Sequence, residues 1–243
     1  MAATFEIQVT ALGDVGDRLK RYAEQKVERT AKLAPRPILF AGVTLAQDAN
    51  PANERPAVAK ASLDVSGRLV RAHVAAPTMT EAVDLLEERL QRRLDILSEH
   101  VSARRRETGS AEPGEWRHGN LPTDRPPYFP RPADERQVVR HKTYAPVALT
   151  PKEAALDMEL LDHDFHLFTN ADTGREAVVY RHEDGVGLLE DAPRESLEEA
   201  IERLDVADGS FVLFVDPATR RGNVLYRRYD GHYGLIAPTG GEA

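Results

Sequence analysis

The sequence contains no cysteine. This absence excludes disulfides, thiol catalysis and cysteine-ligated metal, and it is typical of proteins from a reducing compartment. No segment reaches the roughly 18 uninterrupted apolar residues that a membrane-spanning helix needs. The N-terminal residues MAATFEIQVTALGD also lack a basic segment followed by an apolar run. We therefore expect a cytoplasmic protein with no signal peptide and no membrane partner.

Motifs of catalysis are missing as well. There is no glycine-rich phosphate loop, nucleophile elbow or zinc-ligand spacing. The cluster His163-Asp164-Phe165-His166 would suit a metal or acid–base chemistry, because imidazole and carboxylate groups serve both. However, His163 and Asp164 precede a predicted strand as turn residues. We expect a protein that is not an enzyme and that binds no metal or cofactor. A hydrolase that uses His163, Asp164 and His166 is kept as an alternative to be tested.

Basic residues outnumber acidic ones in one part of the chain only. Residues 1–106 carry 17 Lys and Arg against 14 Asp and Glu, and residues 107–143 carry 6 against 6. Residues 144–243 carry 9 against 20, which accounts for the net charge of -8. Because acidic surfaces repel phosphate, any nucleic-acid partner is expected on residues 1–106.

The C-terminal part contains one unit twice, at an offset of 46 residues. The residues that agree are Phe165, Leu167, Phe168, Val178, Tyr180, Arg181, Asp184 and Gly185 with Phe211, Leu213, Phe214, Val224, Tyr226, Arg227, Asp230 and Gly231. Each copy predicts a helix that starts at a capping box, Thr150 to Glu153 and Ser196 to Glu199, followed by a small sheet. A unit of about 45 residues buries little apolar surface alone, so each copy is expected to need a partner.

Residues 1–106 predict an α+β domain with the order β-α-β-β-β-α. Alternation and β-branched residues indicate strands over 5–10, 38–47, 57–65 and 69–75. Helical stripes indicate helices over 15–33 and from Thr80 to about Val101, which implies a sheet with both helices on one face. Residues 107–143 are rich in proline and poor in aliphatics, and predict a flexible linker. The tandem repeats then occupy 144–192 and 193–243, and we expect them to pair as a pseudo-dimer.

Several runs in the repeats resemble the long-form ribosome hibernation-promoting factors. The resemblance is carried by Met158–Phe165, Phe168–Gly174, Val179–Arg181 and Tyr226–Ile236. The usual long form has one C-terminal copy, and the two-copy arrangement resembles an actinobacterial variant linked to hypoxia and dormancy. The resemblance implies a factor that binds 16S rRNA of the small subunit across the mRNA and tRNA sites and blocks translation under stress. It leaves contacts between the subunits open, and implies no DNA partner.

Basic residues of the first domain are the candidates for rRNA binding. They are Lys26, Arg29, Lys32, Arg68, Arg71, Arg89, Arg92 and Arg93. The alternative is a solvated surface, balanced by Glu24, Glu28, Glu87 and Glu88, on a protein-interaction regulator whose basic face is incidental.

Four aromatic residues are the candidates for pairing between the repeats: Phe168, Tyr180, Phe214 and Tyr226. Since both halves of the pair lie on one chain, their effective concentration is on the order of millimolar, and pairing within the chain is favoured. We then expect single idle 70S ribosomes. Pairing between chains, which would give 100S ribosomes, remains the alternative.

Overall fold

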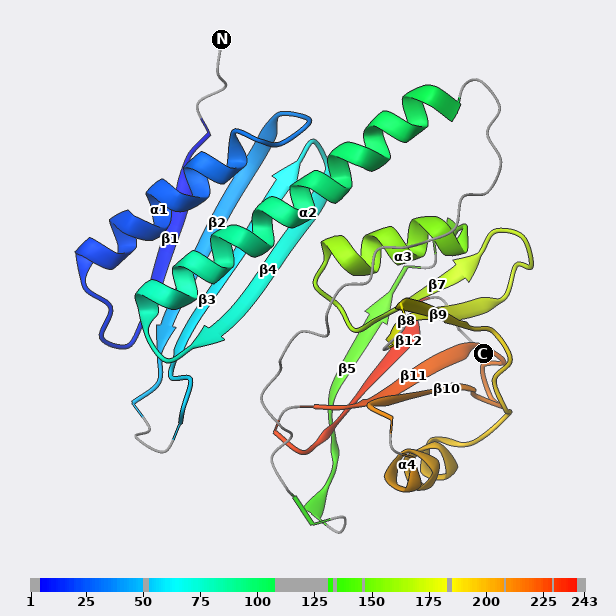
Figure 1. Ribbon diagram of the computed structural model, residues 1–243. Coiled ribbons are helices and arrows are strands. Elements are labelled where there is room, and N and C mark those ends of the chain that lie inside the picture. The colour runs from blue at the N-terminus through cyan, green and yellow to red at the C-terminus, as the bar shows by residue number, and fades with distance from the viewer. Residues whose placement is uncertain are drawn as a thin grey trace. The chain divides into compact units, whose positions relative to one another are not determined.

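The computed structural model describes residues 5–49, 53–107, 131–132, 135–145, 147–182, 185–207, 209–228 and 230–239 (Figure 1). The chain forms two compact units, residues 1–114 with 159–163, and residues 115–158 with 164–243. The fold is mixed α+β, as predicted. No helix among the described residues is long and apolar enough to cross a membrane.

The first unit has the predicted order β-α-β-β-β-α. Its elements are β1 (Ile7–Leu12), α1 (Asp17–Ala31), β2 (Ile38–Gln47), β3 (Ala57–Val65), β4 (Arg68–Ala76) and α2 (Met79–Glu107). The strands form one sheet in the order β1-β2-β3-β4, in which β1 runs parallel to β2 and the later pairs are antiparallel. The α1 crossover makes the parallel pairing of β1 and β2 possible.

Both helices of the first unit cover the same face of its sheet (Figure 1). The apolar stripe of α2 is buried, with exposed fractions from 0% to 2% at Leu86, Leu90, Leu94 and Leu97. On the sheet, burial alternates along β3 and β4, so that only one side of each strand faces the core. The opposite face of the sheet carries polar side chains, among them Thr44, Lys60 and Arg71, beside the exposed Phe40.

The second unit contains two four-stranded sheets, one for each repeat. The elements of repeat 1 are β6 (Ala148–Leu149), α3 (Pro151–Leu160), β7 (Phe165–Asn170), β8 (Glu176–His182) and β9 (Gly185–Leu189). Those of repeat 2 are α4 (Leu197–Val206), β10 (Phe211–Val215), β11 (Gly222–Arg227) and β12 (Tyr233–Pro238). The sheet orders are β6-β7-β8-β9 and β10-β11-β12-β5, where β5 spans Val138–Tyr144.

Both repeat helices start at the capping boxes that the sequence predicts. The Thr150 hydroxyl accepts from the Glu153 N–H (3.3 Å), and the Glu153 carboxylate accepts from the Thr150 N–H (3.1 Å). Ser196 and Glu199 repeat this exchange at the start of α4. Because two N–H groups find partners at each helix start, these ten-residue helices begin at defined positions.

Strand β5 lies inside the range predicted as a linker. It comes before repeat 1 in the chain, yet it pairs in parallel with β12 of repeat 2, from Val138 opposite Tyr233 to Tyr144 opposite Pro238. The prediction of an unstructured segment up to Thr143 was therefore wrong for these residues. The partner strand lies over 90 residues further along the sequence, so no local pattern announces the pairing.

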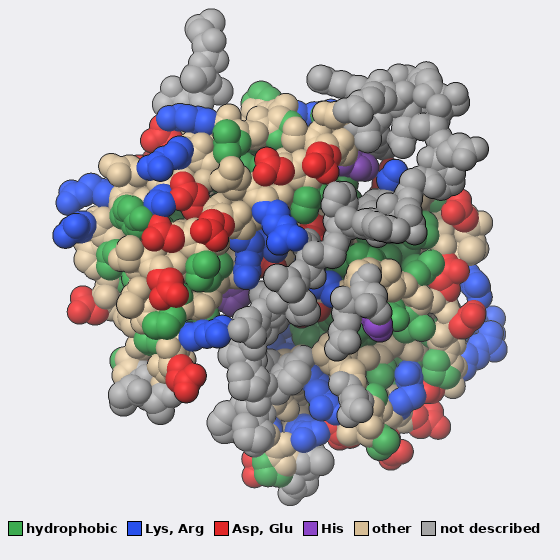
Figure 2. Space-filling view, viewed as in Figure 1, with side chains coloured by type: hydrophobic (Ala, Val, Ile, Leu, Met, Phe, Trp, Pro, Cys, Tyr) green, Lys and Arg blue, Asp and Glu red, His purple; other side chains and the backbone are tan. Residues whose placement is uncertain are grey.

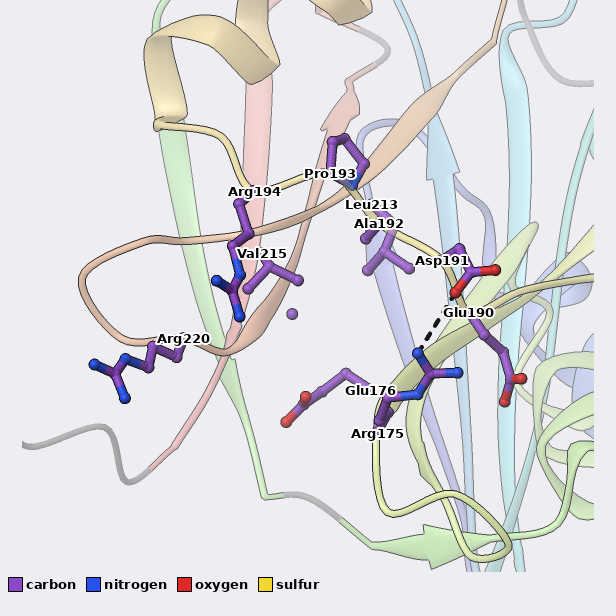
Figure 3. A pocket seen from close by; sticks show the side chains of 11 residues that line it. Arg175, Glu176, Glu190, Asp191, Ala192, Pro193, Arg194, Leu213, Val215 and Arg220 are labelled. Carbon is purple, nitrogen blue, oxygen red and sulfur yellow. Dashed lines mark hydrogen bonds and ion pairs between the residues drawn. The ribbon is translucent and has the colours of Figure 1, made fainter.

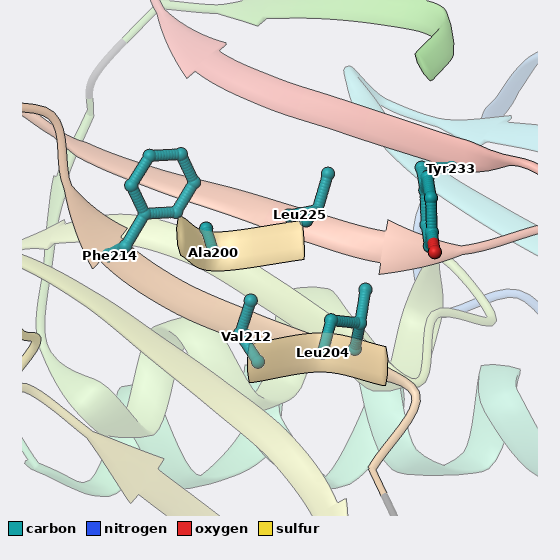
Figure 4. Packing of buried hydrophobic residues seen from close by; sticks show 6 residues of the cluster. All are labelled: Ala200, Leu204, Val212, Phe214, Leu225 and Tyr233. Carbon is teal, nitrogen blue, oxygen red and sulfur yellow. The ribbon is translucent and has the colours of Figure 1, made fainter. Parts of the chain in front are cut away.

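Each repeat helix covers one face of its own sheet. Under α4, a core cluster joins Ala200 and Leu204 of the helix to Phe214, Leu225 and Tyr233 of the strands (Figure 4). The core under α3 is built in the same way, and its buried members are Ala154, Met158, Phe168, Ala177 and Val179. The other face of each sheet is also apolar.

Candidate functional site

The predicted basic residue Lys26 lies between the two helices of the first unit. Its ammonium group is 2.9 Å from a carboxylate oxygen of Asp84 and 2.5 Å from one of Glu87. The hydrogen bonds to Glu87 and then Asp84 hold the pKa of Lys26 above its usual range. Tyr22 donates to the same Asp84 carboxylate (2.6 Å), and this hydrogen bond raises the pKa of Tyr22. Lys26 therefore links α1 to α2, and a phosphate would have to compete with two carboxylates for it.

The other predicted cations of the helices differ in how available they are. Arg29 and Arg92 are exposed, and Lys32 is exposed beside Glu28, with 2.9 Å between the charged groups. Arg89 is half-buried and donates to the backbone carbonyl of His73. The remaining one, Arg93, is 3% exposed and its guanidinium lies 2.6 Å from Asp162 in the same compact unit.

The face of the sheet opposite the helices adds a cation that was not among the predicted residues. Lys60 on β3 and Arg71 on β4 are exposed, and both occupy the strand positions that alternate with buried ones. Arg68 is half-buried at the start of β4, on the parity of the buried positions. The alternation along β3 was the signal that could have identified Lys60, because Ala59 and Ala61 on either side are buried.

Charged residues of both signs are mixed over the first unit. Figure 2 shows Lys and Arg side chains interspersed with Asp and Glu over α1 and α2. Five of the cations considered above are exposed. Arg29, Lys32 and Arg92 lie on the helices, and Lys60 and Arg71 lie on the sheet face. A surface of this kind can bind phosphates through separate exposed side chains, with an affinity that falls as salt rises. The role of each predicted residue in rRNA binding stays a prediction.

The two repeats share a second apolar layer, which we call the shared layer. Its buried members are Leu167, Val178, Leu213 and Val224, and Tyr144, Phe165, Tyr180, Leu189, Ala192, Phe211 and Ile236 pack against them. Most members come in equivalent pairs at the repeat offset. One face of each sheet is therefore covered by its sibling, in the arrangement of a pseudo-twofold pair.

Aromatic rings from both repeats meet in the shared layer. The equivalent residues Phe165 and Phe211 stack on each other, with ring centroids 4.7 Å apart and an interplanar angle of 28°. Phe165 also meets Tyr226, and Phe211 meets Tyr180, each at a centroid distance of 5.7 Å. This reciprocity is what a twofold relation between equivalent residues requires. Burial in the same layer raises the pKa of Tyr144 to about 12.

Two residues predicted for the pairing interface lie elsewhere. Phe168 belongs to the core under α3, and Phe214 belongs to the core under α4. Because alternate residues of a strand face opposite sides, Leu167 and Leu213 take the positions toward the sibling instead. Tyr180 packs in the shared layer and Tyr226 contacts Phe165 across it.

Each of these tyrosines lies over a glycine on the next strand. Tyr180 pairs with Gly187, and Tyr226 pairs with Gly234. A Cβ built on Gly187 would lie 2.4 Å from Tyr180 Cζ, and one on Gly234 would lie 2.3 Å from Tyr226 Cζ. The glycines of both copies therefore leave room for the rings that build the shared layer.

A charged hollow lies where the two repeats meet (Figure 3). Arg175, Arg194 and Arg220 line it together with Glu176, Glu190 and Asp191. Arg175 is 3.5 Å from Asp191, and Arg221 of repeat 2 lies 2.5 Å from Glu176 of repeat 1. The ion pair of Glu176 and Arg221 therefore joins the two repeats beside this hollow.

Among the described residues, no group of three or more His, Asp or Glu side chains is placed to hold a metal. His163, Asp164 and His166 are half-buried, and His166 lies on β7. Burial lowers the pKa of His166, which favours its neutral form.

Comparison with known families matches both units. Residues 7–101 match the family described as "Sigma 54 modulation protein / S30EA ribosomal protein". Residues 133–188 and 191–235 each match the family described as "Sigma 54 modulation/S30EA ribosomal protein C terminus". The chain therefore belongs to the Sigma 54 modulation/S30EA ribosomal protein family, and its C-terminal module occurs twice.

Among curated relatives, a "Ribosome hibernation promotion factor" of Picosynechococcus sp. is 27% identical over 184 residues, covering 72% of this chain and 91% of that protein. One of the same name from Bacillus subtilis is 30% identical over 142 residues, covering 57% of this chain and 74% of that protein. Among solved structures, the N-terminal domain of Thermus thermophilus Protein Y is 22% identical, with a TM-score of 0.31, and covers 37% of this chain and 94% of its own.

Proposed function

We propose that this protein is a ribosome hibernation factor that acts by binding and not by catalysis. In this proposal the first unit binds 16S rRNA at the mRNA and tRNA sites of the small subunit and blocks translation by occupying them. The observation that carries the proposal is the match of both units to one family whose curated relatives are named ribosome hibernation promotion factors. The hypoxia and dormancy roles of the resembling variant belong to the same proposal.

Exposed cations on the first unit support the rRNA contact. If Arg29 and Arg92 meet phosphates, their reversal to glutamate should weaken binding and flatten its salt dependence by about 0.7–0.9 per lost contact on a log–log plot. The matched variant reverses Lys60 and Arg71, so the comparison identifies which face binds. Co-sedimentation with ribosomes across a salt series measures both. Unchanged binding and an unchanged slope in both double variants would contradict an electrostatic rRNA contact by these residues.

The shared layer supports a further part of the proposal, that the protein holds single 70S ribosomes. With the apolar faces of the two repeats turned toward each other, the surface through which a single copy could pair with a second chain is occupied. Sucrose-gradient sedimentation of ribosomes saturated with the protein tests this. A 70S peak alone is expected, and a strong 100S peak would overturn it.

Strand β5 favours the alternative, in which two chains pair and join two ribosomes. It crosses from repeat 1 to the sheet of repeat 2, and only residues 145–147 separate it from β6. Such an element can be exchanged between two copies of a chain. The same gradient separates the two proposals, because exchange between chains predicts the 100S peak.

A further inference from the structure

The two repeats differ at one edge of their sheets. In repeat 2, β12 has β11 on one side and β5 on the other. In repeat 1, β9 is the equivalent of β12 and pairs with β8, but no described strand lies on its outer edge. The backbone groups along that edge of β9 are consequently available to another extended segment.

The connectivity of a tandem repeat explains the difference. At the repeat offset of 46 residues, β5 corresponds to residues 184–190, which include β9 itself. The segment that could have filled the edge of repeat 1 is therefore already used as the last strand of that repeat. The pair has two equivalent edges and one strand to cover them.

The edge of β12, which β5 covers, shows which contacts are missing at the edge of β9. Tyr233 on β12 is 1% exposed, in a core cluster against which Val138 of β5 and Leu235 pack. Arg136, just before β5, pairs at 2.7 Å with Asp205 of α4. In Figure 4 the ring of Tyr233 lies beyond Leu204 and Leu225, at the end of the same cluster.

On β9 the equivalent apolar side chains are uncovered. Val186 and Leu188 stand at the positions of Tyr233 and Leu235, and they are 46% and 44% exposed. The strand, GVGLL, contains no proline and no charge. Natural edge strands commonly carry lysine or proline where pairing has to be prevented. Neither device is present on this one.

The sequence of β5 and the charges next to β9 indicate what kind of segment would fit the edge of β9. β5 reads VVRHKTY, a strand that begins with apolar residues and continues with basic ones. β9 is followed by Glu190 and Asp191, and the Asp191 side chain is 96% exposed. These acidic residues favour a basic segment.

We propose that the outer edge of β9 binds an extended, basic segment of a partner protein. The segment adds to the sheet in parallel with β9, as β5 adds to β12, and its apolar residues cover Val186 and Leu188. Main-chain hydrogen bonds would supply affinity, and the apolar side chains and the carboxylates of Glu190 and Asp191 would supply selectivity. This interaction is separate from rRNA binding by the first unit.

A fluorescent peptide of sequence QVVRHKTY, which is residues 137–144, serves as the probe. The edge of β12 is already held by the tethered β5 at an effective concentration on the order of millimolar, so micromolar peptide should reach β9 instead. Fluorescence anisotropy with the full chain is expected to show saturable binding that weakens as salt rises. A peptide with glutamate in place of its Arg and Lys should bind less tightly.

Leu188→Lys tests the site, because the substitution places a charge on an exposed position and leaves the cores intact. We expect it to weaken peptide binding by about tenfold or more. Val147→Lys is the matched control, since Val147 is 57% exposed and its carbonyl accepts from Thr169 at the other edge of the same sheet. Thermal unfolding of both variants establishes that they fold alike.

Three outcomes would overturn the proposal. The first is the absence of saturable peptide binding to the unmodified chain. The second is binding that Leu188→Lys leaves unchanged, which would place the peptide elsewhere. The third is a concentration-dependent dimer of the chain alone that Leu188→Lys abolishes, because the occupant of the edge would then be a second copy. Analytical ultracentrifugation without peptide measures this last outcome.

Discussion

The two units cover their sheets in different ways. In the first unit, α1 and α2 lie on one face, and the other face carries polar side chains such as Lys60 and Arg71. In the second unit, each small sheet has a helix on one face and the shared layer on the other. A sheet with two long helices buries enough apolar surface on one side alone, whereas a repeat with one ten-residue helix does not. The comparison implies that pairing is part of the folding of the repeats.

The largest effect is expected from a charge placed in the shared layer. Val224 is fully buried there, and Val224→Asp would leave an unpaired carboxylate between the sheets. We expect the second unit to lose about 3–5 kcal/mol of unfolding free energy. Thr44→Asp on the polar face of the first unit is the matched change, with an expected effect within about 0.5 kcal/mol. Urea unfolding measures both, and similar losses would refute the contrast between the units.

A smaller loss is expected from a methyl group under a tyrosine ring. Gly234→Ala would place a Cβ 2.3 Å from the Tyr226 ring, so the ring has to move out of the shared layer. Overpacking of this kind costs about 1–3 kcal/mol. Gly187→Ala should behave alike, because the same geometry recurs in repeat 1.

The control for the glycine variants is Gly209→Ala. Its added Cβ would meet no atom closer than 3.5 Å, so little change in unfolding free energy is expected. Thermal unfolding separates the three variants. If Gly209→Ala destabilised the protein as much as the other two, the fit between tyrosine and glycine would not be the cause.

Lys26 and Tyr22 make polar contacts between the two helices of the first unit, and the contribution of Lys26 to stability should be modest. Lys26→Met removes the cation that faces Asp84 and Glu87, and we expect a loss of about 1 kcal/mol after allowance for solvent screening. Lys32→Met removes the cation of a mostly exposed pair and should change stability by less than about 0.5 kcal/mol. Raising the salt concentration should narrow the difference in urea unfolding, and a difference that stays constant would argue against an electrostatic origin.

Features written in short stretches of sequence were predictable. The capping box of Thr150 and Glu153 and the buried stripe of α2 both follow from spacing, because their partners lie within a few turns of the same helix. The match between the copies likewise indicated that a repeat needs a partner. The structure has these elements where the sequence predicts them, because they do not depend on residues far away in the sequence.

Features that depend on partners far away in the sequence were not predictable from it. Phe168 and Leu167 are both apolar, and when both faces of a sheet are buried, hydrophobicity does not tell which face meets the helix. β5 finds its only described pairing strand on repeat 2, and Lys26 finds its carboxylates on another helix. Spacing within one element carries no information about either.

The smallest predicted effect distinguishes the helix-side cores of the two repeats. His166 lies at the position that Val212 occupies in repeat 2, at the offset of 46 residues. Burial lowers the pKa of His166 in the folded protein, and the negative charge of Asp157 opposes this only in part. The unfolded chain, with a histidine pKa near 6.5, therefore takes up a proton more readily than the folded one. Stability from this residue is present above that pH and declines as the pH falls below it.

His166→Val installs the residue of repeat 2 and removes the titration. Unfolding free energies of the wild type and the variant are to be measured from pH 7.5 down to pH 5, and the difference between the two proteins is followed. As the pH falls, the unfolding free energy of the variant should rise relative to that of the wild type, because only the wild type has a histidine that protonates more readily in the unfolded chain. A difference that stays constant would show that His166 titrates alike in the folded and unfolded chains. The two repeats would then differ at this position in packing alone, and not in their response to acid.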